Sequence, residues 1–68
     1  MNEEALNLSI RKFLKMVGIR SQREIEQAVQ KALAAGQVKG TESFPAKMRL
    51  TVEGLQVDVT FEGEIELA

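Results

Sequence analysis

Alternation of apolar and other residues from Ala46 to Phe61 constrains the fold of this chain most strongly. If the segment folds at Glu53-Gly54, every apolar side chain meets another across two antiparallel strands. The expected apolar pairs are Val52–Leu55, Leu50–Val57, Met48–Val59 and Ala46–Phe61, and the polar pairs are Arg49–Asp58 and Thr51–Gln56. The pattern therefore predicts a β-hairpin with strands at about 46–53 and 55–62, one face apolar and the other polar.

The residues after Phe61 allow two arrangements. Ile65 and Leu67 continue the odd-numbered apolar series, so the second strand can run on with a bend at Gly63. Alternatively Glu62-Gly63-Glu64 turns back and residues 64–67 form a third strand. If the strand runs on, we expect its end to pass beyond its partner and to offer an edge to a second chain.

The N-terminal half carries the signals of two helices, at about 3–17 and 22–35. Asn2 suits an N-cap, and Gly18 suits the left-handed residue that ends a helix. Ser21 and Glu24 have the spacing of a capping box for the second helix, which we expect to end at Gly36. Apolar residues recur at helical spacing in both segments: Leu6, Ile10, Phe13, Leu14 and Val17 in the first, and Ile25, Ala28, Val29, Ala32 and Leu33 in the second.

This order of elements predicts an α+β fold in a single domain, residues 1–68. The two helices are expected to pack on an antiparallel hairpin or three-stranded meander. A loop, residues 36–45, connects the halves. A chain of 68 residues builds only a small core, and it has no cysteine for a disulfide and no histidine for a Cys/His zinc site. We therefore expect association with a second copy, as a homodimer, to supply the missing stability.

Charge is divided along the chain. Residues 1–39 hold seven Lys or Arg and four acids, a net +3, whereas residues 40–68 hold two and six, a net −4. These halves can attract each other within or between molecules. No apolar run is long enough to span a bilayer, and the acidic N-terminus is unlike a signal peptide. We expect a cytoplasmic protein without a membrane partner.

The residues usually needed for catalysis are scarce. With no His, Cys or Tyr, proton transfer would depend on Asp, Glu or Lys, and the single Asp58 is accounted for by Arg49. Glu62, Glu64 and Glu66 alternate as the solvent face of a strand does. No glycine-rich phosphate loop is present. We expect no enzymatic activity, no catalytic residues, no cofactor and no metal.

Nucleic-acid binding is the alternative. Residues 13–25 resemble a helix-turn-helix, with the glycine turn at Gly18. Against this alternative, Glu24 occupies a position that is usually apolar, the third helix is missing, and the chain is net acidic. The candidate nucleic-acid contacts are Arg11, Lys12, Lys15, Arg20 and Arg23, and the candidate self-association residues are Leu8, Ile65 and Leu67.

Several segments resemble a family of short bacterial proteins of unknown function. They are Met1 to Asn7, Ile10 to Lys15, Val17-Gly18, Ser21 to Glu26 and Pro45 to Lys47. The resemblance covers nearly the whole chain and implies a bacterial cytoplasmic protein, with no activity or site to transfer. The function is therefore unknown at this point, and the leading hypothesis is a non-enzymatic protein that self-associates and acts through protein contacts, with an unknown protein partner.

Overall fold

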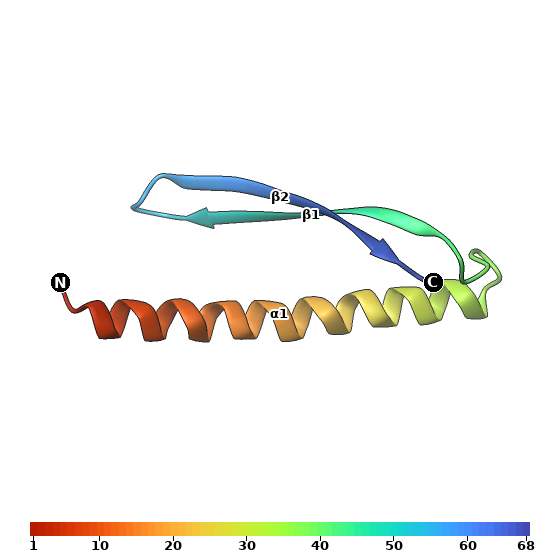
Figure 1. Cartoon of the computed structure of the whole chain (residues 1–68), viewed down its shortest axis with the longest axis horizontal. Helices are drawn as coiled ribbons and strands as arrows, with labels where there is room; N and C mark the ends of the chain where they lie inside the picture. The colour runs from red at the N-terminus through yellow and green to blue at the C-terminus, as the bar shows by residue number, and fades with distance from the viewer. The chain divides into compact units, whose positions relative to one another are not determined.

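The computed structural model describes all residues, 1–68, and contains one helix and one β-hairpin. Helix α1 spans Glu3–Ala34, strand β1 spans Ser43–Val52 and strand β2 spans Val57–Glu66 (Figure 1). The chain divides into two compact units, a helical unit, Met1–Ala35, and a hairpin unit, Gly36–Ala68. The α+β class and the antiparallel hairpin are confirmed.

Both ends of α1 form as the sequence predicts. The Asn2 side chain accepts a hydrogen bond from the Ala5 amide at 3.1 Å, which satisfies one of the free N–H groups of the first turn. At the other end the Ala35 amide donates to the Lys31 carbonyl at 3.0 Å. Gly36 follows with φ of +72°, the left-handed conformation that ends many helices.

The prediction of two separate helices is wrong, because α1 continues through Gly18 and Ser21 for 32 residues. Gly18 has no positive φ, so it does not adopt the conformation of a helix-ending glycine. A glycine inside a helix costs only about 1 kcal/mol relative to alanine. Ending a helix and starting another leaves several backbone N–H and C=O groups without partners, and this costs more unless tertiary contacts replace them.

Continuity joins the first predicted apolar stripe to part of the second, because Val29 and Leu33 lie further round the helix at 100° per residue. Leu6, Val17 and Ala28 recur at intervals of eleven residues, which is about three helical turns. We call the combined surface the α1 stripe; its members are Leu6, Ile10, Phe13, Leu14, Val17, Ile25, Ala28 and Ala32. Ser21 interrupts its middle, and its side chains are large before this point and mostly small after it.

The hairpin keeps the predicted faces but has a different register. Val52 pairs with Val57 and Leu50 with Val59, whereas the expected partners were Leu55 and Val57. Every β1 residue is therefore paired two positions further along β2 than predicted. Because side chains alternate with a period of two, a shift of two residues leaves each one on the same face.

The register shift originates in the loop that joins the strands. Four residues, Glu53 to Gln56, lie between the strands in place of a two-residue turn at Glu53-Gly54. The Leu55 amide donates to the Val52 carbonyl at 3.3 Å. A two-residue type I′ turn would require positive φ at Glu53, whereas the longer loop places it at Gly54 and Gln56. Glycine accepts this conformation without steric cost.

The end of the chain continues β2, so of the two arrangements that the sequence allows, the continuous strand is correct and the third strand is wrong. Gly63 lies within β2 opposite Ala46, and Ile65 lies opposite Phe44. The Leu67 amide donates to the Glu42 carbonyl at 2.9 Å, which extends the pairing past the end of β2. The strand does not outrun its partner, because β1 begins at Ser43 and not at Ala46. Phe44 and Pro45, expected in the loop, belong to β1.

No residue of the chain is fully buried. A single helix and a two-stranded hairpin each have a side that nothing within the unit can cover, because a core requires two packed layers. Phe61, for example, is 57% exposed and Leu14 is 55% exposed. The sequence correctly predicted which side chains share the apolar side of the hairpin, but neither unit builds a core.

Candidate interaction surface

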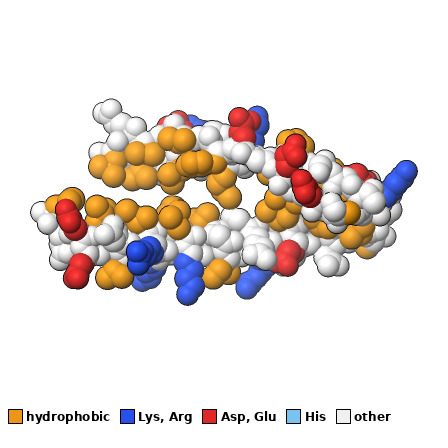
Figure 2. Space-filling model, viewed as in Figure 1, with side chains coloured by type: hydrophobic (Ala, Val, Ile, Leu, Met, Phe, Trp, Pro, Cys, Tyr) orange, Lys and Arg blue, Asp and Glu red, His pale blue; other side chains and the backbone are white.

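One face of the hairpin is apolar along its whole length. All five pairs on this face are apolar or glycine, and the face continues without a charged residue from one end to the other. We call it the apolar face; it comprises Phe44, Ala46, Met48, Leu50, Val52, Val57, Val59, Phe61, Gly63 and Ile65. Hydrophobic side chains gather along the hairpin in Figure 2. A two-stranded hairpin is not stable in water by itself, so this face requires a cover.

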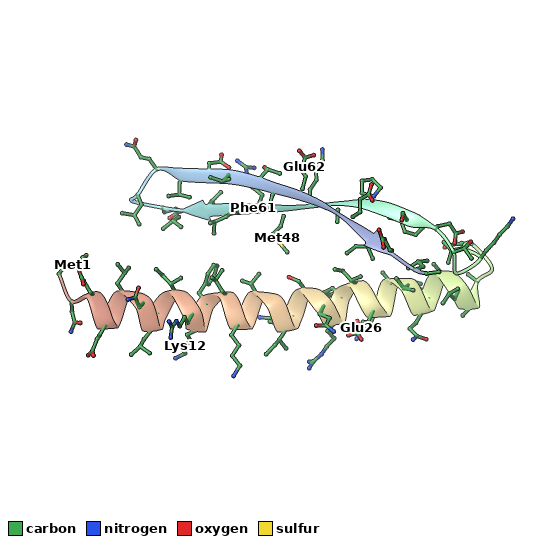
Figure 3. The ribbon with its side chains drawn as sticks, in the orientation of Figure 1. Met1, Lys12, Glu26, Met48, Phe61 and Glu62 are labelled. Carbon is green, nitrogen blue, oxygen red and sulfur yellow. The ribbon has the colours of Figure 1, made fainter.

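The opposite face of the hairpin carries its charges. Met48 and Glu62 extend from opposite sides of the ribbon in Figure 3. The Arg49 guanidinium makes two hydrogen bonds to the Asp58 carboxylate, at 2.9 Å and 2.7 Å. This pairing lowers the pKa of Asp58 and raises the pKa of Arg49. A longer ion pair joins Lys47 to Glu62 at 3.7 Å.

The Arg49–Asp58 contact was predicted, but its geometry differs. Arg49 lies directly opposite Thr60, so it reaches Asp58 along the diagonal. Long side chains reach a diagonal neighbour readily. Both partners are more than half exposed, so solvent screening limits the contribution of this pair to stability.

The two strands present different edges to solvent. In an antiparallel ladder, opposite residues alternate between hydrogen-bonded pairs and pairs whose N–H and C=O groups point outward. The hydrogen bond from Leu67 to Glu42 makes this pair a bonded one, so the even-numbered residues of β1 bond inward. Odd-numbered residues of β1 and even-numbered residues of β2 therefore direct their backbone groups to the free edges. Pro45, which has no N–H, interrupts the edge of β1.

The Glu42 carboxylate binds the backbone of the segment just before β1. Glu42 accepts hydrogen bonds from the Lys39 amide at 2.8 Å, the Gly40 amide at 2.9 Å and the Thr41 amide at 3.1 Å. The bond from Lys39, followed by those from the other amides, lowers the pKa of Glu42. Three converging N–H groups form an anion-binding concavity, and the side chain of Glu42 itself fills it. The motif holds the chain just ahead of the first paired residues.

The predicted self-association residues do not lie together. Ile65 belongs to the apolar face and Leu67 follows β2, and both are half-buried. Leu8 lies on α1 and is 66% exposed. At 100° per residue it projects away from the α1 stripe. Ile65 and Leu67 are thus paired within the hairpin and do not form a protruding strand end.

The predicted nucleic-acid contacts all lie on α1, but the helix-turn-helix is wrong. Residues 13–25 form continuous helix without a turn, so no second helix projects at the angle that groove binding requires. Between Ala5 and Arg23 the helix has no acid and five cations, Arg11, Lys12, Lys15, Arg20 and Arg23. Lys12 and Glu26 extend from the same side of α1 in Figure 3. Nothing in this arrangement favours nucleic-acid binding.

Sequence reasoning missed two residues of the hairpin. Phe44 continues the apolar alternation of Ala46 and Met48, but Pro45 suggested a loop there. Its neighbour Pro45 is acceptable because its nitrogen faces the free edge. The alternation alone was the signal that could have identified Phe44. Glu42 gave no such signal, because its role depends on the backbone conformation of residues 39–41.

No group of three or more Asp, Glu, His or Cys side chains is arranged to hold a metal ion. The only helix, α1, lacks the hydrophobicity that crossing a membrane would require of a segment of its length.

Together, a capped helix and a two-faced hairpin define a small α+β protein whose exposed apolar surfaces are its main feature. The chain belongs to a family of unknown function, DUF6494, which matches residues 1–68. No curated protein and no solved structure matches the chain. The family supports the resemblance found in the sequence and, like the fold, names no activity.

Proposed function

We propose that the chain is a non-enzymatic, cytoplasmic bacterial protein that forms a homodimer and acts through protein contacts. The apolar face of the hairpin is the surface that joins the two copies. The observation that carries this proposal is the separation of side chains: every charged residue of β1 and β2 lies off this face. Separation on this scale is typical of a surface that is covered in the functional state.

Exposure of the large side chains supports the same surface. Phe61, Val59 and Met48 are 57%, 45% and 44% exposed, and they are neighbours on the apolar face. Aromatic and methionine side chains are enriched where proteins meet. A second copy supplies an identical face, as the two-fold symmetry of most homodimers requires.

Size exclusion coupled to light scattering tests the proposal. We expect a dimer at ~100 μM, well above micromolar dissociation constants. Phe61→Asp places a charge on the apolar face and should abolish the dimer, whereas Thr60→Asp places the same charge on the polar face and should retain it. A wild-type chain that is monomeric at this concentration would overturn the proposal.

Thermal unfolding supplies a test that needs no substitution. If the copies stabilise each other, the unfolding midpoint must rise with protein concentration. We expect this rise in circular dichroism between low and high micromolar protein. A midpoint independent of concentration over this range contradicts the homodimer.

A further inference from the structure

We propose that the free edge of β2 is a docking site for a strand of another protein in which Lys or Arg alternates with apolar residues. This inference concerns an edge of the hairpin and not its apolar face, so it does not depend on the homodimer. The partner would add a third strand to the two-stranded sheet, a recurrent mode of peptide recognition.

The backbone groups available for this pairing follow from the register. The even-numbered residues of β2 direct their N–H and C=O groups outward, since the odd-numbered ones bond to β1. The outward-facing residues are Asp58, Thr60, Glu62, Glu64 and Glu66. None is proline, so every N–H is available along the whole strand. Pro45 removes one donor from the other edge, so β2 offers the more complete ladder.

The charges along this edge determine which strand it can accept. Asp58 is held by Arg49 and Glu62 is weakly paired with Lys47, whereas Glu64 and Glu66 make no ion pair. Opposite charges on adjacent strands are favourable and like charges are not. A partner strand with cations on the polar side would compensate Glu64 and Glu66, and its apolar residues would extend the apolar face.

The same charges oppose pairing of this edge with the β2 edge of a second copy. In antiparallel pairings of two β2 edges that overlap over most of the strand, acids face acids, for example Glu62 opposite Glu64. Charged side chains commonly protect an edge strand from self-pairing in this way. The edge is therefore closed to its own copy and open to a basic strand.

Peptide binding followed by amide hydrogen exchange in NMR tests the proposal on the wild-type chain. The probes are a short synthetic peptide of alternating lysine and valine and its counterpart of alternating glutamate and valine. We expect the lysine peptide to slow exchange at the even-numbered residues from Asp58 to Glu66. The odd-numbered amides of β2, already bonded to β1, are the internal control.

A charge reversal tests the selectivity. Glu64→Lys should weaken binding of the lysine peptide about tenfold, since a favourable cross-strand pair becomes an unfavourable one. Glu53→Lys makes the same change of charge in the hairpin loop and should leave binding unchanged. Equal protection by the two peptides, protection at Lys47 and Arg49 of β1, or no protection at ~1 mM peptide, the limit of weak affinity, would each overturn the proposal.

Discussion

A wrong prediction of local structure has different consequences in the helical unit and in the hairpin unit. In the hairpin, a register error of two residues left every side chain on its predicted face. In the helical unit, two capping signals placed a break where the backbone continues, so a whole element was divided. Strand alternation therefore tolerates local error, whereas helix boundaries depend on single residues with small energies.

The difference has a physical origin in the range of the interactions. Each backbone hydrogen bond of α1 joins residues only four positions apart, so signals of about 1 kcal/mol each decide locally whether the helix continues or breaks. Each residue of β1 bonds to a residue of β2, so the loop length decides all the pairs together.

A disulfide between the strands should form in one register only. Arg49→Cys with Thr60→Cys joins directly opposite residues, whose Cα atoms are about 4.5 Å apart in a pair of this kind. Arg49→Cys with Asp58→Cys joins diagonal residues, about 7–8 Å apart and beyond normal disulfide reach. The wild-type chain has no cysteine, so mass spectrometry after mild oxidation reads the result directly. Preferential closure of the diagonal pair would restore the register predicted from sequence.

Proline at position 22 should distinguish one continuous helix from two separate helices. In α1, Gln22 is an interior residue, so Gln22→Pro should cost about 3 kcal/mol of helix stability. At the first position of a separate helix after Ser21, the same proline would be tolerated. Glu3→Pro, at the true start of α1, is the matched control and should have little effect. Helicity by circular dichroism and the unfolding midpoint measure both variants; equal, small losses would argue for two helices.

Replacing Gly18 and Gly36 by alanine should have opposite effects on stability. A Cβ at Gly18 meets nothing within 4 Å, and the backbone there is helical, so Gly18→Ala should stabilise by up to about 1 kcal/mol. Gly36 has φ of +72°, so Gly36→Ala should destabilise by about 1–2 kcal/mol. Chemical denaturation of both variants gives the two signs. Destabilisation by Gly18→Ala would indicate that the helix ends there.

Acid should loosen the segment before β1 without first separating the strands. Hydrogen bonds from Lys39, Gly40 and Thr41 lower the pKa of Glu42, so the folded segment binds fewer protons than the unfolded one. This stabilisation is complete above the ordinary glutamate pKa of about 4.3 and is lost as the pH falls through the lower folded value. In NMR, the amide signals of these three residues should move together as the pH falls below the ordinary glutamate pKa.

A matched substitution checks the assignment. Glu42→Gln should remove the shared acid transition, because an amide does not titrate in this range. Glu53→Gln, an exposed residue of the hairpin loop, should leave it in place. Persistence of the transition in the Glu42 variant would show that another group is responsible.

Part of the candidate surface could be predicted from the sequence. Alternation identified most of the apolar face and the Arg49–Asp58 contact, since both depend on which face a residue occupies. The end of the strand pairing was not accessible, because it depends on the register and on where β1 begins. Thus the alternative of a continuous strand predicts a protruding end at Leu67, whereas the Leu67 amide bonds to Glu42.

The ends of the helical region and the faces of the hairpin follow from short-range signals in the sequence. Asn2 and Gly36 determine the ends of the helical region, and alternation determines the two faces of the hairpin, because each relies on neighbours within a few residues. The tertiary structure alone decided that α1 passes through Gly18 and that Val52 pairs with Val57. In both cases the local signals for either alternative are small, so only the complete set of backbone hydrogen bonds distinguishes the alternatives.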